Sequence, residues 1–187
     1  MRGWLEDKSY EIVGLEALRE GPDIEAISPD GLRTAFEVKL IGDEDNDMKR
    51  LLKKRLLKSI AGKPSPDSVS PYDAMNYLAF RAYEAAVQLG SVGANRVIVL
   101  AVDVTAWWRF EPQLENRWID FRQPKFFQQE ASASGHEFIE NQKNKYPNFP
   151  GDCAAAMREV DSIWIVTKSS DIQLELKYNL PIRGRRR

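Results

Sequence analysis

Apolar and polar positions in the first quarter of the chain follow the short period that is typical of strands. Residues 10–18 mix apolar and acidic side chains without a decisive period, and we interpret them as a strand rather than a short helix. Residues 22–27 alternate, and residues 32–41 resume an extended pattern after the turn composition of residues 28–31, Ser-Pro-Asp-Gly. Proline presets one turn dihedral and glycine accepts the other, so this stretch predicts a β-hairpin.

Two later stretches have the period of an amphipathic helix. Residues 45–61 repeat apolar side chains four positions apart and end at a Gly-Lys-Pro segment. A second helix is predicted to begin at Ser70 and Pro71, which suit the cap and the first helical position. It continues through Ala85 and stops near Gly90.

The rest of the chain predicts further strands and short helices. Residues 97–104 are nearly all β-branched or aliphatic, as in a central strand that is covered on both faces. The other expected elements are a helix at 136–145, a short helix at 154–160 capped by Asp152, and strands at 163–167 and 172–180. Residues 106–130 are irregular and rich in aromatic side chains, which we interpret as a cover over the core.

These elements predict one α/β domain over residues 1–187, in which a mixed central β-sheet is flanked by helices and the core spans about residues 10–105. Hydrophobic residues make up 43% of the chain and charged residues 29%, as in soluble proteins. No apolar run is long enough to cross a membrane, and the N-terminus lacks a signal core. Cys153 has no cysteine partner and is expected to be a core thiol, so we predict a cytoplasmic protein.

Charged residues are unevenly distributed along the chain, although the net charge is only −1. Residues 1–48 hold 13 acidic and 5 basic side chains, whereas residues 49–63 hold seven basic and no acidic ones. Arg50, Lys54 and Lys58 share one face of the predicted first helix and are candidates for binding a nucleic-acid backbone. A solvated basic face explains the same pattern, and charge alone does not decide.

The hairpin holds the strongest candidate chemistry. Side chains alternate along a strand, so Glu37 and Lys39 project from one face while Phe36 and Val38 project from the other. A tight turn at residues 28–31 would bring Asp23 alongside them. Two carboxylates and an ammonium in a small volume suit Mg²⁺ or Mn²⁺ together with a phosphate group.

The Pro22-Asp23 pair and the Glu37-Val38-Lys39 triplet resemble the active-site hairpin of the PD-(D/E)xK nuclease superfamily, which has a restriction endonuclease-like fold. The resemblance implies a metal-dependent nuclease that hydrolyses phosphodiester bonds, with DNA favoured as the substrate. Asp23 and Glu37 would then hold the ion together with the Val38 carbonyl. Lys39 would orient the attacking water and stabilise the transition state.

Accessory residues are less well defined. The family commonly has an acidic residue on a helix before the first strand, and Glu6 is the best-placed candidate in the short segment available here. Glu11 or Glu16 would serve only if residues 10–18 were helical, and Glu25 shares the face of Asp23 but is interpreted as an exposed strand glutamate. Some members also carry a polar residue and an aromatic four positions apart on the second helix. Loose matches here, with plain helix packing the favoured interpretation, are Asn76 with Phe80 and Tyr77 with Arg81.

Other chemistries have little support in the sequence. His136 is the only histidine, which excludes clustered-histidine sites, and no phosphate-cradling or dinucleotide-binding loop is found. The alternative function is a binding module for nucleic acid or a protein on the same fold without turnover. Whether two copies assemble to cut both strands of a duplex stays open.

Overall fold

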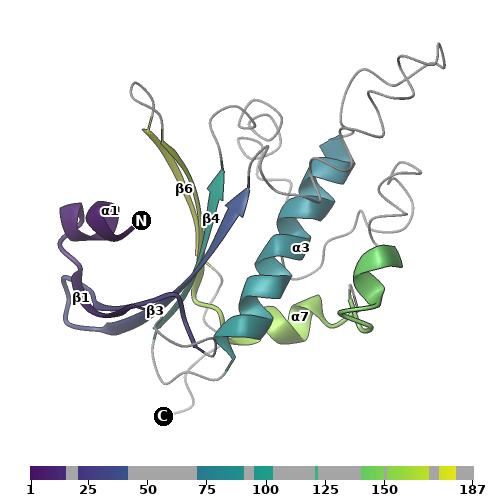
Figure 1. Cartoon of the computed structure of the whole chain (residues 1–187), viewed down its shortest axis with the longest axis horizontal. Helices are drawn as coiled ribbons and strands as arrows, with labels where there is room; N and C mark the ends of the chain where they lie inside the picture. The colour runs from purple at the N-terminus through teal and green to yellow at the C-terminus, as the bar shows by residue number, and fades with distance from the viewer. Residues whose placement is uncertain are drawn as a thin grey trace.

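The computed structural model describes residues 1–15, 21–41, 71–90, 95–102, 121, 140–149, 151–168 and 173–179. A short helix α1 (Arg2–Asp7) precedes strands β1 (Glu11–Leu15), β2 (Ile24–Ile27) and β3 (Arg33–Ile41). Helix α3 (Pro71–Leu89) and strand β4 (Asn95–Val102) follow. The last elements are α7 (Cys153–Ala156), the 3₁₀ turn η1 (Met157–Glu159), β5 (Ser162–Lys168) and β6 (Gln173–Asn179). Helix α1 lies on one side of the sheet, and α3 and α7 lie on the other (Figure 1).

The six described strands form one sheet in the order in which they occur along the chain. The pairs β1–β2, β2–β3 and β5–β6 are antiparallel, whereas β3–β4 and β4–β5 are parallel. A parallel neighbour requires a crossover connection, and α3 lies within the one between β3 and β4. The predicted α/β class with a mixed central sheet flanked by helices is therefore confirmed.

The hairpin of β2 and β3 folds as its turn chemistry predicts. The Gly31 amide donates to the Ser28 carbonyl at 2.8 Å, and Gly31 has a φ of 81°, which glycine adopts without a steric penalty. The Ser28 hydroxyl also accepts a hydrogen bond from the Leu32 amide at 3.0 Å. These bonds fix the register in which Ile24 faces Phe36.

Two apolar cores cover the two faces of the sheet. The core beneath α1 contains Leu5, Phe36 and Trp164, which are all buried. The core beneath α3 contains the buried helix residues Tyr77 and Phe80 together with sheet residues from β3, β4 and β5. Alternate residues of β4 enter the two cores, as expected for a central strand covered on both faces.

Most element types agree with the sequence patterns. The segment after Tyr10 is a strand, α3 begins at Pro71, and Cys153 is buried in the core. Phe121, in the aromatic stretch, is also buried in the core beneath α3. No described helix combines the length and the apolar character needed to cross a membrane. The predicted helix at 45–61, with Arg50, Lys54 and Lys58, lies outside the described residues.

The predicted helix at 154–160 requires correction. Regular α-helix ends at Ala156, and the 3₁₀ turn η1 follows. Asp152 occupies the capping position, but its side chain makes no capping hydrogen bond. Its Oδ2 atom instead accepts a hydrogen bond from the Tyr83 hydroxyl at 2.9 Å, which ties α7 to α3. The Asp152 side chain therefore makes a tertiary hydrogen bond to Tyr83 in place of the predicted capping bond.

Candidate functional site

The hairpin places the three predicted site residues on one face of the sheet, beneath α3. Ala35 and Ile41 of β3 belong to the core beneath α3, whereas Phe36 belongs to the core beneath α1. Because side chains alternate along β3, Glu37 and Lys39 share the face of Ala35 and Ile41. The register that pairs Ile24 with Phe36 places Asp23, the residue just before β2, opposite Glu37.

Asp23 is fixed by the backbone of β3. Its Oδ2 atom accepts a hydrogen bond from the Val38 amide at 2.7 Å. The strand β2 begins at Ile24, and continuing its register places Pro22 opposite Val38. Proline has no amide hydrogen and cannot donate to Val38, so a regular ladder cannot continue at this position.

The Val38 carbonyl also lacks a backbone donor on the β2 side. The amide and the carbonyl of a strand residue point toward the same neighbour in an antiparallel ladder. The Val38 carbonyl therefore points toward the end of β2, where Pro22 offers it no hydrogen-bond donor. Pro22 and Asp23, just before β2, thus leave a backbone oxygen of β3 beside the Asp23 carboxylate.

Glu37 is a buried carboxylate with one paired and one unpaired oxygen. Its Oε1 atom accepts a hydrogen bond from the Lys39 ammonium at 2.7 Å. Its Oε2 atom is buried and has no hydrogen-bond partner among the described residues. Burial raises the pKa of Glu37 above its ordinary value, the charge of Lys39 opposes this rise, and the charge of Asp23 adds to it. The two carboxylates are thus close enough to interact electrostatically.

Lys39 is held from two sides. Its ammonium donates to Glu37 within β3 and to the Oε1 atom of Gln88 in the last turn of α3. The side chain of Lys39 is only 11% exposed, so these partners replace most of the water that an ammonium would otherwise bind. A buried ammonium held in this way is fixed in position beside Glu37.

A second buried carboxylate on α3 extends the group of charges. Glu84 accepts a hydrogen bond from Arg81 at 2.6 Å on Oε2, and from Lys145 at 3.0 Å and Tyr146 at 3.3 Å on Oε1. Burial tends to raise the pKa of Glu84, but the charges of Arg81, Lys145 and Lys39 outweigh it and lower the pKa below its ordinary value. Glu84 therefore joins a cation of α3 to a cation of the segment 140–149, and the charge of Lys39 on β3 also acts on it.

Glu84 and Gln88 were not predicted as site residues. They lie four positions apart on a helix whose other positions between Tyr77 and Leu89 are mostly buried and apolar. Residues four apart share one helical face, so two polar side chains on a mostly apolar helix were the available signal. Tyr77 and Phe80 pack in the core, and Arg81 pairs with Glu84, which favours helix packing over the loose motif matches. The side chain of Asn76 lies outside the described residues.

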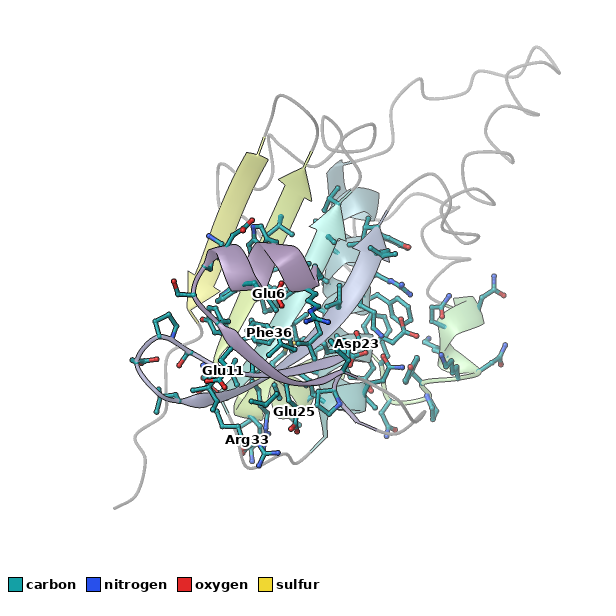
Figure 2. All side chains as sticks on the ribbon, turned by 60° about the vertical axis from the view of Figure 1, so that its left-hand side comes forward. Glu6, Glu11, Asp23, Glu25, Arg33 and Phe36 are labelled. Atoms are coloured by element: carbon teal, nitrogen blue, oxygen red, sulfur yellow. The ribbon has the colours of Figure 1, made fainter. Side chains whose placement is uncertain are left out.

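The candidate accessory acids lie elsewhere. Glu6 is on α1, the helix that covers the opposite face of the sheet, and it pairs with Arg2 at 2.9 Å on the surface (Figure 2). Glu25 pairs with Arg33 at 2.6 Å near the turn end of the hairpin. Glu11 is an exposed residue of β1, and Glu16 lies outside the described residues. The sequence-based interpretation of Glu25 as a surface strand glutamate agrees with this ion pair.

The donor set at Asp23 and Glu37 consists of hard oxygen atoms. Two carboxylates and a backbone carbonyl are ligands of the kind that Mg²⁺ and Mn²⁺ use in proteins, usually with several waters retained. No group of three or more histidine, cysteine, aspartate or glutamate side chains in the described part of the chain is arranged to hold a metal ion. An ion at this position would thus depend on two side chains, the carbonyl and solvent or substrate oxygens.

Comparison with known proteins adds no relative to this picture. No protein-family model, curated protein or solved structure matches the chain.

Proposed function

We propose that the chain is a metal-dependent nuclease of the PD-(D/E)xK type, with Asp23, Glu37 and Lys39 as its catalytic residues. The observation that carries the proposal is the unpaired Oε2 atom of Glu37, which is buried beside Asp23 and Lys39. A buried carboxylate oxygen without a partner is costly to the fold, and sites that bind a cation are one common reason to retain it.

The order of the elements also supports this proposal. A short helix, an antiparallel hairpin, a helix and a buried parallel strand follow one another in the described part of the chain, as expected for a restriction endonuclease-like domain. The three charged residues Asp23, Glu37 and Lys39 lie on the face of the sheet that α3 covers. We therefore favour a catalytic role over a structural ion pair.

Asp23, Glu37 and the Val38 carbonyl would hold Mg²⁺ or Mn²⁺. When bound, the ion would supply Lewis acidity, which activates water and offsets charge on the phosphate. Lys39 would orient the attacking water and stabilise the negative charge that grows on the phosphate oxygens. Water attack at phosphorus breaks one phosphorus–oxygen bond of the phosphodiester, and we favour DNA as the substrate.

Gln88 has a supporting role in this proposal. If Glu37 turns toward an ion, its hydrogen bond to Lys39 weakens, but the bond from Lys39 to Gln88 remains available. The negative charge of Glu84 acts on the same ammonium. Helix α3 would therefore hold Lys39 in place whether Glu37 binds Lys39 or the ion.

The direct test is cleavage of plasmid, linear duplex and single-stranded DNA, with RNA in parallel, in the presence of Mg²⁺ or Mn²⁺. Lys39→Ala should slow cleavage by about 100-fold to 1,000-fold, the range for loss of one group that stabilises a transition state. Lys8→Ala is the matched control, since Lys8 lies over the Trp4 ring of α1. Wild-type cleavage rates in Lys39→Ala would refute the assignment of this residue.

Metal binding can be tested without turnover. At a concentration tenfold above its dissociation constant, Mn²⁺ or Ca²⁺ should raise the free energy of unfolding by about 1.4 kcal/mol, measured by thermal or chemical denaturation. Glu37→Gln should remove this gain, whereas Glu25→Gln should retain it because Glu25 is paired with Arg33. An equal gain in wild type and Glu37→Gln would mean that the ion binds elsewhere.

A further inference from the structure

Lys145 is a solvent-facing cation that the structure attaches to the candidate site. It lies in the segment 140–149, which begins with a helical turn and had no predicted role in binding. Its ammonium donates to Glu84 Oε1 at 3.0 Å, yet 65% of its side chain remains exposed. An ammonium has three donors, so this bond leaves capacity for a further acceptor.

The contacts around Lys145 restrict the conformation of its side chain. Its ammonium lies 5.1 Å from the centroid of the Tyr146 ring, and the Tyr146 hydroxyl donates to the same Glu84 oxygen. The ring of Tyr146 packs edge-on against Phe80, which is buried in the core. A surface lysine usually samples many rotamers, but this one is tied to a buried carboxylate on a core helix.

Helix α3 connects Lys145 to the catalytic lysine. Glu84 accepts a hydrogen bond from Lys145, and Gln88, four positions along the same helix, accepts one from Lys39. The charges of Lys145 and Lys39 also both lower the pKa of Glu84. Arg81 binds the other oxygen of Glu84, and its side chain is only 20% exposed. Lys145 is therefore the most exposed of the three cations around Glu84.

The charges of the site favour a polyanion once an ion is present. Asp23, Glu37 and Glu84 carry three negative charges, and Lys39, Arg81 and Lys145 carry three positive ones. The group is neutral by itself, and a divalent ion makes it positive by two. Double-stranded DNA carries one phosphate charge for about every 3.4 Å of helix axis on each strand, so one phosphate can lie at the site while a neighbouring phosphate contacts an adjacent lysine.

We infer that Lys145 binds a backbone phosphate of the nucleic acid whose scissile group lies at Asp23, Glu37 and Lys39. The inference rests on the proposed nuclease function and assigns one contact of its substrate. Phosphate contacts position a nucleic acid without reading its sequence. Lys145 therefore contributes to affinity and register and takes no part in bond cleavage.

The experiment measures binding of a fluorescent DNA oligonucleotide to the full chain by anisotropy, with Ca²⁺ and with a chelator, over about 50 to 200 mM salt. Lys145→Gln should weaken binding in Ca²⁺ by roughly threefold to tenfold and lower the slope of log affinity against log salt by about 0.9. In cleavage assays it should raise KM and leave kcat near the wild-type value.

Lys143→Gln is the matched control. Lys143 lies two residues away, has the same charge, and pairs with the exposed Glu140 at 2.5 Å rather than with Glu84. It should bind DNA like the wild type. Lys145→Arg should restore the salt slope because it keeps the charge, and Lys145→Met keeps the aliphatic stem against Tyr146 if the glutamine variant folds poorly.

The outcomes separate the two proposals. If the wild-type chain binds DNA but Lys145→Gln and Lys143→Gln behave alike, Lys145 has no special contact and the inference is wrong. A drop in kcat without a change in KM or in the salt slope would also overturn it. If the wild-type chain neither binds nor cleaves DNA or RNA with metal present, the proposed function fails and this inference fails with it.

Discussion

The two faces of strand β3 differ sharply, although their residues alternate along one chain segment. On the face toward α1, Phe36 is fully buried and packs edge-on against Tyr10 and Trp164. On the face toward α3, the buried Glu37 and the partly buried Lys39 form a charged pair between the sheet and the helix. Burial of apolar side chains on the first face stabilises the fold. On the second face, charged side chains lose their hydration, and a purely structural strand would not need them there.

The charged face of β3 is the less favourable one for stability. A buried ion pair offers little net stability compared with an apolar pair of similar volume, because both charges are desolvated. Retaining two neighbouring carboxylates, one with an unpaired oxygen, makes the α3 face less stable than it could be. Proteins accept such local costs mainly at sites that bind or react.

The largest expected effect lies on the apolar face. Phe36→Ala should lower the free energy of unfolding by about 3–5 kcal/mol, because it removes a large buried ring and leaves a cavity. Urea denaturation measures this loss, and Phe36→Leu, which fills more of the space, should lose less. Metal affinity of the folded Phe36→Leu protein should be unchanged. A weaker metal site in that variant would show that the two faces are coupled.

A smaller, pH-dependent effect is expected at Glu84. Its pKa in the folded state is lowered, so the stability it contributes is present above its ordinary pKa of 4.5 and is lost as pH falls through the folded value. Glu84→Gln should cost about 1–3 kcal/mol at neutral pH, because charged hydrogen bonds to Arg81 and Lys145 are weakened.

Urea denaturation of both proteins at pH 7 and at acid pH checks this prediction. The difference between wild type and Glu84→Gln should shrink as pH falls below 4.5. Glu140→Gln is the control, because Glu140 is an exposed acid that pairs with Lys143 three residues along. A difference that stays constant from pH 7 to acid pH would mean that the charge of Glu84 does not stabilise the fold.

The smallest effect is expected at Glu25, which lies on the same hairpin as Asp23 but near the surface. Its ion pair with Arg33 involves side chains that are 28% and 64% exposed, respectively. Glu25→Gln should change the free energy of unfolding by only about 0–1 kcal/mol, and less at high salt because exposed charges are screened. A double-mutant cycle with Arg33→Gln in low and high salt measures the coupling. A large coupling that resists salt would place Glu25 with the buried charges.

The hairpin, and the face of it on which the charges lie, could be predicted from the residues alone. The turn at Ser28 to Gly31 is local chemistry, and strand alternation places Glu37 and Lys39 opposite Phe36 whatever packs above them. The buried strand β4 and the start of α3 at Pro71 were predictable for the same reason. Each of these features depends on residues that are close together along the chain.

The other groups around the candidate site could not be predicted, because they come from distant parts of the chain. Gln88 reaches Lys39 across 49 residues, and Lys145 reaches Glu84 across 61. The Asp152 side chain likewise does not make its predicted capping bond and instead accepts a hydrogen bond from Tyr83, 69 residues away. A periodic pattern reveals which face of an element is buried, but the angle and depth at which two elements pack depend on all the side chains between them. Contacts between distant polar side chains are therefore known only once the helix lies on the sheet.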